Sequence, residues 1–92
     1  MRERLFTILF AVIRNHNLGI DKVALKEIES QIDIFASTYK SGTKRRDGIV
    51  DFEKFIQRVS NHSQRQDQQL ITLESIASAR DECGLIFWCK TE

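Results

Sequence analysis

The chain has 92 residues, and its 14 lysines and arginines nearly balance its 13 aspartates and glutamates, leaving a net charge of +1. This balance excludes a globally basic surface, so binding to nucleic acid or an anionic membrane would need a local patch. Proline is absent and there are only four glycines, which favours helices over a turn-rich fold. We therefore predict a single all-α domain over residues 1–92, a small bundle of about four helices.

The first predicted helix covers residues 2–15 and opens an antiparallel helical hairpin over residues 2–39. Its apolar residues occupy so many sides that we expect it at the centre of the bundle. They are Leu5, Phe6, Ile8, Leu9, Phe10, Val12 and Ile13. The apolar run is only about nine residues long, with no small-residue cleavage site after it, so we expect a buried amphipathic helix rather than a signal peptide. We expect a cytoplasmic protein with no membrane partner.

The second predicted helix begins after Asp21, whose carboxylate suits an N-cap, and continues to Tyr39. Apolar residues follow along it at alternating spacings of three and four. They are Leu25, Ile28, Ile32, Phe35 and Tyr39. This seam of about two heptads can pack against the first helix or against a second copy of the chain.

An exposed basic loop is predicted for residues 40–50, followed by a third helix over 51–61 that Asp51 caps. The buried face of that helix is predicted to hold Phe52, Phe55, Ile56 and Val59. Gly48 is expected to take the turn before it.

Residues 62–67 contain no apolar side chain and are assigned as a polar linker, although the same composition also allows a polar extension of the flanking helices. A fourth helix and an apolar tail then cover residues 68–90. Leu85, Phe87 and Trp88 lie in this tail, which periodicity alone allows to be a helix extension or a short strand. Large aromatic residues dominate binding hot spots, so Phe87 and Trp88, together with the nearby Leu85, are the predicted contacts with a partner protein.

The segment DGIVDFEKF resembles the second half of an EF-hand calcium loop, with Asp47 and Gly48 at the fifth and sixth positions. The resemblance implies a helix-loop-helix shape. The same alignment puts Thr43, Arg45 and Lys54 at loop positions one, three and twelve, where calcium needs oxygen ligands. We therefore expect no bound metal.

The helix ending in EIESQIDIFASTY resembles the second helix of the small two-helix aspartyl-phosphate phosphatases of sporulation phosphorelays. In that alignment Asp33 falls on the acid of their Ser-x-x-x-Asp motif and Tyr39 on its closing aromatic residue. Glu29 stands where those proteins have serine. The resemblance implies a helical hairpin that acts on a phosphorylated response regulator through Asp33.

Four cationic residues fall close together at Lys40, Lys44, Arg45 and Arg46, and Arg58 on the next helix is placed to extend them. Such a cluster can contact phosphates, which makes a nucleic-acid-binding regulator using residues 40–46 the alternative function. No aromatic residue is interleaved with these cations to stack on bases.

Catalytic and metal-binding patterns are sparse. His16 is expected at a helix end and His62 in solvent, while Cys83 and Cys89 match no zinc-ligand spacing. We therefore expect no enzyme, no cofactor and no metal. The leading hypothesis is a small regulatory or adaptor protein that binds a partner protein and acts as a homodimer.

Overall fold

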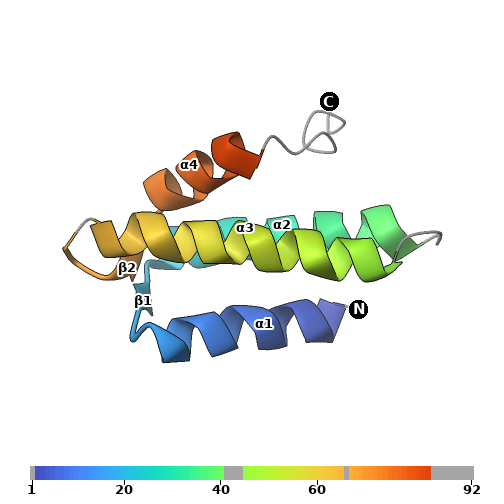
Figure 1. Cartoon of the computed structure of the whole chain (residues 1–92), viewed down its shortest axis with the longest axis horizontal. Coiled ribbons are helices and arrows are strands. Elements are labelled where there is room, and N and C mark those ends of the chain that lie inside the picture. Colours follow the sequence, from blue (N-terminus) through green and yellow to red (C-terminus); the bar gives the residue numbers. More distant parts are fainter. Residues whose placement is uncertain (1, 41–44, 66, 84–92) are drawn as a thin grey trace.

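The computed structural model describes residues 2–40, 45–65 and 67–83 (Figure 1). Within those ranges the chain forms four helices and two short strands, which confirms the predicted all-α bundle. In chain order they are α1 (Arg2–Asn15), β1 (Gly19–Ile20), α2 (Lys22–Lys40), α3 (Arg45–Arg65), β2 (Leu70–Ile71) and α4 (Leu73–Cys83).

Consecutive helices run in opposite directions, so α1 and α2 form the predicted antiparallel hairpin (Figure 1). Both strands lie at one end of the bundle, where β1 leads from α1 into α2 and β2 leads from α3 into α4. Their pairing is parallel, with Gly19 opposite Leu70 and Ile20 opposite Ile71. The chain is therefore a helix–strand–helix unit used twice, joined through its two strands.

The core takes apolar side chains from every helix and from β2. Its centre is a contact of three phenylalanines, in which the ring centroids of Phe35 and Phe52 lie 5.2 Å apart and those of Phe52 and Phe55 lie 6.2 Å apart. All three side chains are fully buried. Two of these rings come from α3, which contacts each of the other helices.

The prediction that the first helix lies at the centre is wrong, because α1 lies at the edge of the bundle (Figure 1). It packs against α2 and α3 on one side and buries only Leu5, Leu9 and Val12 fully or nearly so. Phe10, on its outer side, remains 50% exposed. Apolar content alone did not determine position, because a helix at the edge has neighbours on one side only.

The end of α1 is fixed by a Schellman motif. Asn17 adopts a left-handed conformation with φ of 56°, and the Leu18 amide donates to the Ile13 carbonyl oxygen at 2.9 Å. Asparagine tolerates this conformation better than most residues with a Cβ. The turn directs Leu18 into the core and starts β1, whose Gly19 amide donates to the Gln69 carbonyl oxygen at 2.9 Å.

The loop predicted for residues 40–50 is wrong at both ends, because α2 continues to Lys40 and α3 begins at Arg45. Asp51 is therefore inside α3 rather than at its start, and Gly48 also lies within the helix. The EF-hand interpretation is also wrong, because its loop positions three to twelve are helical. The missed signal is Ile49, which packs against the core and starts the apolar stripe of α3 one turn earlier.

Of the two alternatives for residues 62–67, the structure shows the polar helix extension as far as Arg65, where α3 ends, so the linker assignment is wrong there. The fourth helix begins at Leu73 rather than at residue 68. Two small serines extend the buried face of α3 beyond its last apolar residue. Ser60 and Ser63 are fully buried, and the Ser63 hydroxyl donates to the Val59 carbonyl oxygen at 2.8 Å. A satisfied hydroxyl can be buried at little cost, so a polar stretch continued the helix.

Candidate binding surfaces

An open groove of about 630 Å³ lies along α3 between α1 and the end of α4. One wall, from α1, is mostly apolar, and the other, from α3, is polar. The lining residues are Ile8, Ala11, Val12 and Asn15 of α1, Glu53, Lys54, Gln57, Arg58 and Asn61 of α3, and Glu82 of α4. The lining residues Ile8 and Val12 pack with the core, so this wall is held in place by the fold.

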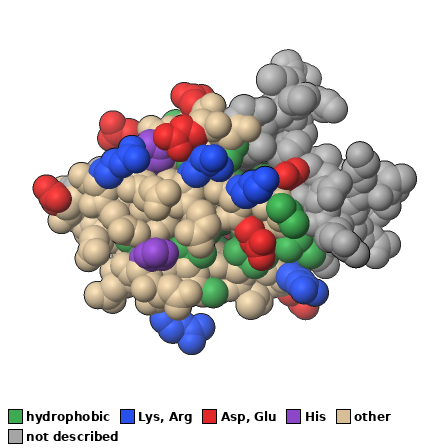
Figure 2. Space-filling view, in the orientation of Figure 1, with side chains coloured by type: hydrophobic (Ala, Val, Ile, Leu, Met, Phe, Trp, Pro, Cys, Tyr) green, Lys and Arg blue, Asp and Glu red, His purple; other side chains and the backbone are tan. Residues whose placement is uncertain are grey.

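The groove carries little net charge of its own. Its lining holds two cations, Lys54 and Arg58, and two carboxylates, Glu53 and Glu82, together with the uncharged amides of Gln57 and Asn61. Figure 2 views the molecule in the orientation of Figure 1. Uncharged polar side chains and backbone dominate the middle of this face, and hydrophobic side chains gather toward its right-hand end. The surface therefore suits a ligand with mixed polar and apolar sides rather than a polyanion.

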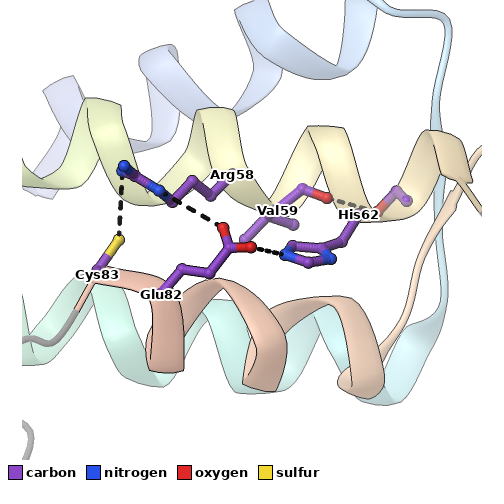
Figure 3. A network of polar contacts seen from close by, with 6 residues as sticks. Arg58, Val59, His62, Glu82 and Cys83 are labelled. Atoms are coloured by element: carbon purple, nitrogen blue, oxygen red, sulfur yellow. Dashed lines mark hydrogen bonds and ion pairs between the residues drawn. The ribbon is translucent and has the colours of Figure 1, made fainter.

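A polar network joins α3 to α4 beside the groove (Figure 3). Glu82 lies between Arg58 and His62, with its two carboxylate oxygens 3.5 Å from Arg58 Nε and 2.9 Å from His62 Nε2. The His62 pair is close but not aligned for a hydrogen bond. The predicted solvent position of His62 is wrong, since its side chain is only 17% exposed. Because α3 runs past residue 61, this position faces α4.

Cys83 closes the network at the end of α4. Arg58 Nη1 donates to its sulfur at 3.8 Å, a length typical of weak hydrogen bonds to sulfur. Burial raises the pKa of the Cys83 thiol above its ordinary value of 9.0, and the nearby Arg58 charge opposes that rise. The thiol is therefore held in its protonated form at neutral pH, which makes it a poor nucleophile.

The outward side of α1 is a second exposed surface. The rings of Phe6 and Phe10 stack with their centroids 6.0 Å apart, and Arg2 Cζ lies 4.9 Å from the Phe6 centroid. Arg2 also pairs with Asp33 of α2 at 2.6 Å, Nε to Oδ1, between two exposed side chains. Asp33 thus lies on the surface beside α1.

The predicted basic residues are not all brought together. Arg58 is roughly 20 Å along the axis of α3 from Arg45, and Glu82 pairs with it. Lys40 ends α2, and Arg45 and Arg46 begin α3. Lys44 lies outside the described residues. The structure therefore separates Arg58 from the cluster that it was predicted to extend.

The predicted partner contacts Leu85, Phe87 and Trp88 lie outside the described residues, as does Cys89. The residues that line the groove were not predicted as a site. One available signal was the row of polar residues Lys54, Gln57 and Asn61, which repeats at helical spacing along one exposed side of α3. Their pairing with Ile8 of α1 depends on tertiary packing, which the sequence does not display.

No three His, Cys, Asp or Glu side chains in the described ranges gather where they could hold a metal ion. Among the same residues, no helix has the length and apolar content needed to cross a membrane. Comparison with protein-family models, with curated proteins and with solved structures finds no match for this chain. Function is therefore inferred from the geometry of these surfaces.

Proposed function

We propose that this protein is a non-enzymatic cytoplasmic regulator or adaptor that acts as a homodimer and binds a partner protein in the groove between α1 and α3. The observation that carries the proposal is the unequal pair of groove walls, apolar on α1 and polar on α3. Grooves between helices are a recurrent docking place for amphipathic helices.

The partner segment that fits these walls is an amphipathic helix. Its apolar side would cover Ile8, Ala11 and Val12, which α1 presents at the spacing of one helical side. Its polar side would exchange hydrogen bonds with Gln57 and Asn61, whose exposed amides both donate and accept. Lys54 and Glu53 would then favour opposite charges on the partner helix at the rim of the groove.

Nucleic-acid binding through residues 40–46 is the alternative function. Three features of the described residues favour a protein partner instead. Arg58 already pairs with Glu82, the groove is lined by carboxylates as well as cations, and no exposed aromatic ring lies in it to stack on bases. The two functions differ in their response to salt, because phosphate contacts weaken steeply as salt rises and apolar contacts do not.

A capture experiment with matched variants tests the groove. Wild type, Gln57→Trp and Gln68→Trp would each be used as bait in native lysate, with and without nuclease, and captured proteins identified by mass spectrometry. Gln57 lines the groove and Gln68 lies before β2, while both are exposed, so either tryptophan should leave the fold intact. The indole ring introduced by Gln57→Trp would fill the groove.

We expect a protein captured by wild type and by Gln68→Trp to be lost with Gln57→Trp, with or without nuclease. Titration of that purified protein should then give an affinity at least about tenfold weaker for Gln57→Trp, a loss of about 1.4 kcal/mol. Equal capture by the two variants would reject the groove. Loss of all captured proteins after nuclease treatment would favour the nucleic-acid alternative.

A further inference from the structure

Four residues form a single exposed stripe along the outward side of α1. Glu3, Thr7, Phe10 and Arg14 follow one another at spacings of four, three and four, and all four are exposed. This is the spacing of a seam along which two helices pack. The stripe, which we call the outer stripe, lies opposite the buried residues of α1, and the Phe6 ring of the same helix stacks beside its Phe10.

The outer stripe has an acidic residue at one end and a basic residue at the other. Among the described residues, no ion pair uses the Glu3 or Arg14 side chain. If two copies of α1 pack antiparallel with a two-fold axis between Thr7 and Phe10, each Glu3 meets the Arg14 of the other chain. Each Phe10 then packs over the Thr7 of the other chain. The stripe is thus complementary to itself in charge, and it pairs the large Phe10 with the smaller Thr7.

From this pattern we infer that α1 is the homodimer interface, with a second copy of this chain as the occupant of the outer stripe. The inference rests on the homodimer in the proposed function and specifies its geometry. The groove residues Ile8, Val12 and Asn15 project from a different side of α1 and stay uncovered in the dimer, whereas Ala11, four residues after Thr7, lies at the border between the groove and the stripe. The half-exposed Phe10 is covered, which removes the largest apolar side chain on this surface from water.

Charge reversal at the two ends of the stripe tests the pairing. In Glu3→Arg homodimers two arginines would meet at each end, and in Arg14→Glu homodimers two glutamates would meet. In an equimolar mixture, a Glu3→Arg chain and an Arg14→Glu chain would restore an opposite-charge pair at both ends. Sedimentation equilibrium from about 1 µM to about 1 mM would follow each sample, and circular dichroism would check its helix content.

The two charges also favour the helix dipole of α1, since Glu3 lies in its first turn and Arg14 in its last. Mixing the variants distinguishes the two roles, because a dipole effect within each chain is not rescued by a second chain. We expect wild type and the mixture to reach a mass of twice 10.7 kDa, and each variant alone to dissociate at least about tenfold more readily.

A matched pair of apolar variants gives a second readout. Phe10→Ser should abolish the dimer, whereas Leu73→Ser, at a residue of similar exposure on α4, should retain it. A monomeric wild type, a mixture that stays monomeric, or equal dimerisation of Phe10→Ser and Leu73→Ser would each overturn the inference. Groove-dependent capture by a monomeric chain would then leave partner binding standing and reject the homodimer alone.

Discussion

The two helix–strand–helix units of this chain share an order of elements but hold their helices together differently. In the first unit, the polar tie between α1 and α2 is the exposed pair of Arg2 and Asp33. In the second, a partly buried network of Arg58, His62 and Glu82 joins α3 to α4. The more apolar opening helix, α1, lies at the edge, and the more polar α3 lies at the centre of the contacts.

The difference indicates that a helix is buried according to how cleanly its polar and apolar side chains are separated onto two sides, more than according to how many apolar side chains it has. The buried side of α3 is broad and continuous, and small serines extend it at its end. α1 distributes phenylalanine and isoleucine around most of its circumference, more than its neighbours can cover. As a result the Phe10 side chain stays half exposed, and exposed apolar side chains of this size commonly mark an interaction surface.

The largest contrast is expected between Phe52 and Phe10. Phe52→Ala removes a fully buried ring from the phenylalanine cluster and should lower the free energy of unfolding by about 3–5 kcal/mol. Phe10→Ala should lower it by less than about 0.5 kcal/mol, because half of that side chain already faces water. Urea unfolding at high dilution, followed by circular dichroism, measures both. Equal losses would show that α1 is not an edge helix.

The helix caps give a smaller contrast. At the start of α4, Ser75 Oγ accepts from the Thr72 amide at 2.9 Å and donates to the Thr72 carbonyl oxygen at 2.8 Å. Ser75→Ala leaves a partly buried amide unpaired and should cost about 1–2 kcal/mol. Asp21 accepts one exposed, 3.3 Å bond from the Val23 amide, so Asp21→Ala should cost about 0.5 kcal/mol. The reverse order in urea unfolding would contradict the comparison.

Loss of an ion pair should also destabilise the second unit more than the first, but the difference should be smaller than that between the helix caps. Glu82→Gln weakens the contacts with Arg58 and His62 and should cost about 0.5–1 kcal/mol, since the His62 side chain is mostly buried. Asp33→Asn, at an exposed pair, should leave the unfolding midpoint unchanged within error. Thermal unfolding at low and high salt distinguishes the two ion pairs, because salt screens an exposed pair more completely than a partly buried one. A larger effect at Asp33 would refute this ranking.

The smallest effect concerns pH and the end of α4. Burial raises the pKa of the Cys83 thiol above 9.0, so the folded chain retains the proton more tightly than the unfolded chain. This contribution to stability is complete below pH 9 and is lost as pH rises through the folded pKa. In a Cys89→Ser background, alkylation should be half-maximal above pH 9.0, and Arg58→Gln should move it higher still. A midpoint below 9.0 would contradict the packing of α4 on α3.

Hydrophobic periodicity was sufficient to predict the hairpin of α1 and α2, because both helices carry apolar stripes and recognisable ends. It failed at the ends of α3. Gly48 and Asp51 are typical of turns and caps, yet burial of Ile49 and of Phe52 outweighed their preferences. The strands were also missed, since two residues are too few for an alternating pattern and their pairing is determined by the bundle.

The candidate site was harder to predict than the fold. Glu82 and His62 pair across α3 and α4, and Ile8 and Gln57 line the same groove from α1 and α3, at separations that sequence spacing does not indicate. The outer stripe is different, because its spacing and its opposite end charges are visible in the sequence. What the sequence does not show is that α1 lies at the edge, which leaves this side uncovered.

Hydroxyl-radical footprinting across a concentration series tests most directly whether α1 carries the interface. Phe10 and Leu73 have similar exposure in one chain, at 50% and 47%, and each serves as a reference for the other. If the outer stripe pairs with a second copy, oxidation of Phe10 falls as protein concentration rises while oxidation of Leu73 stays constant. A constant ratio of the two rates at every concentration would contradict the account.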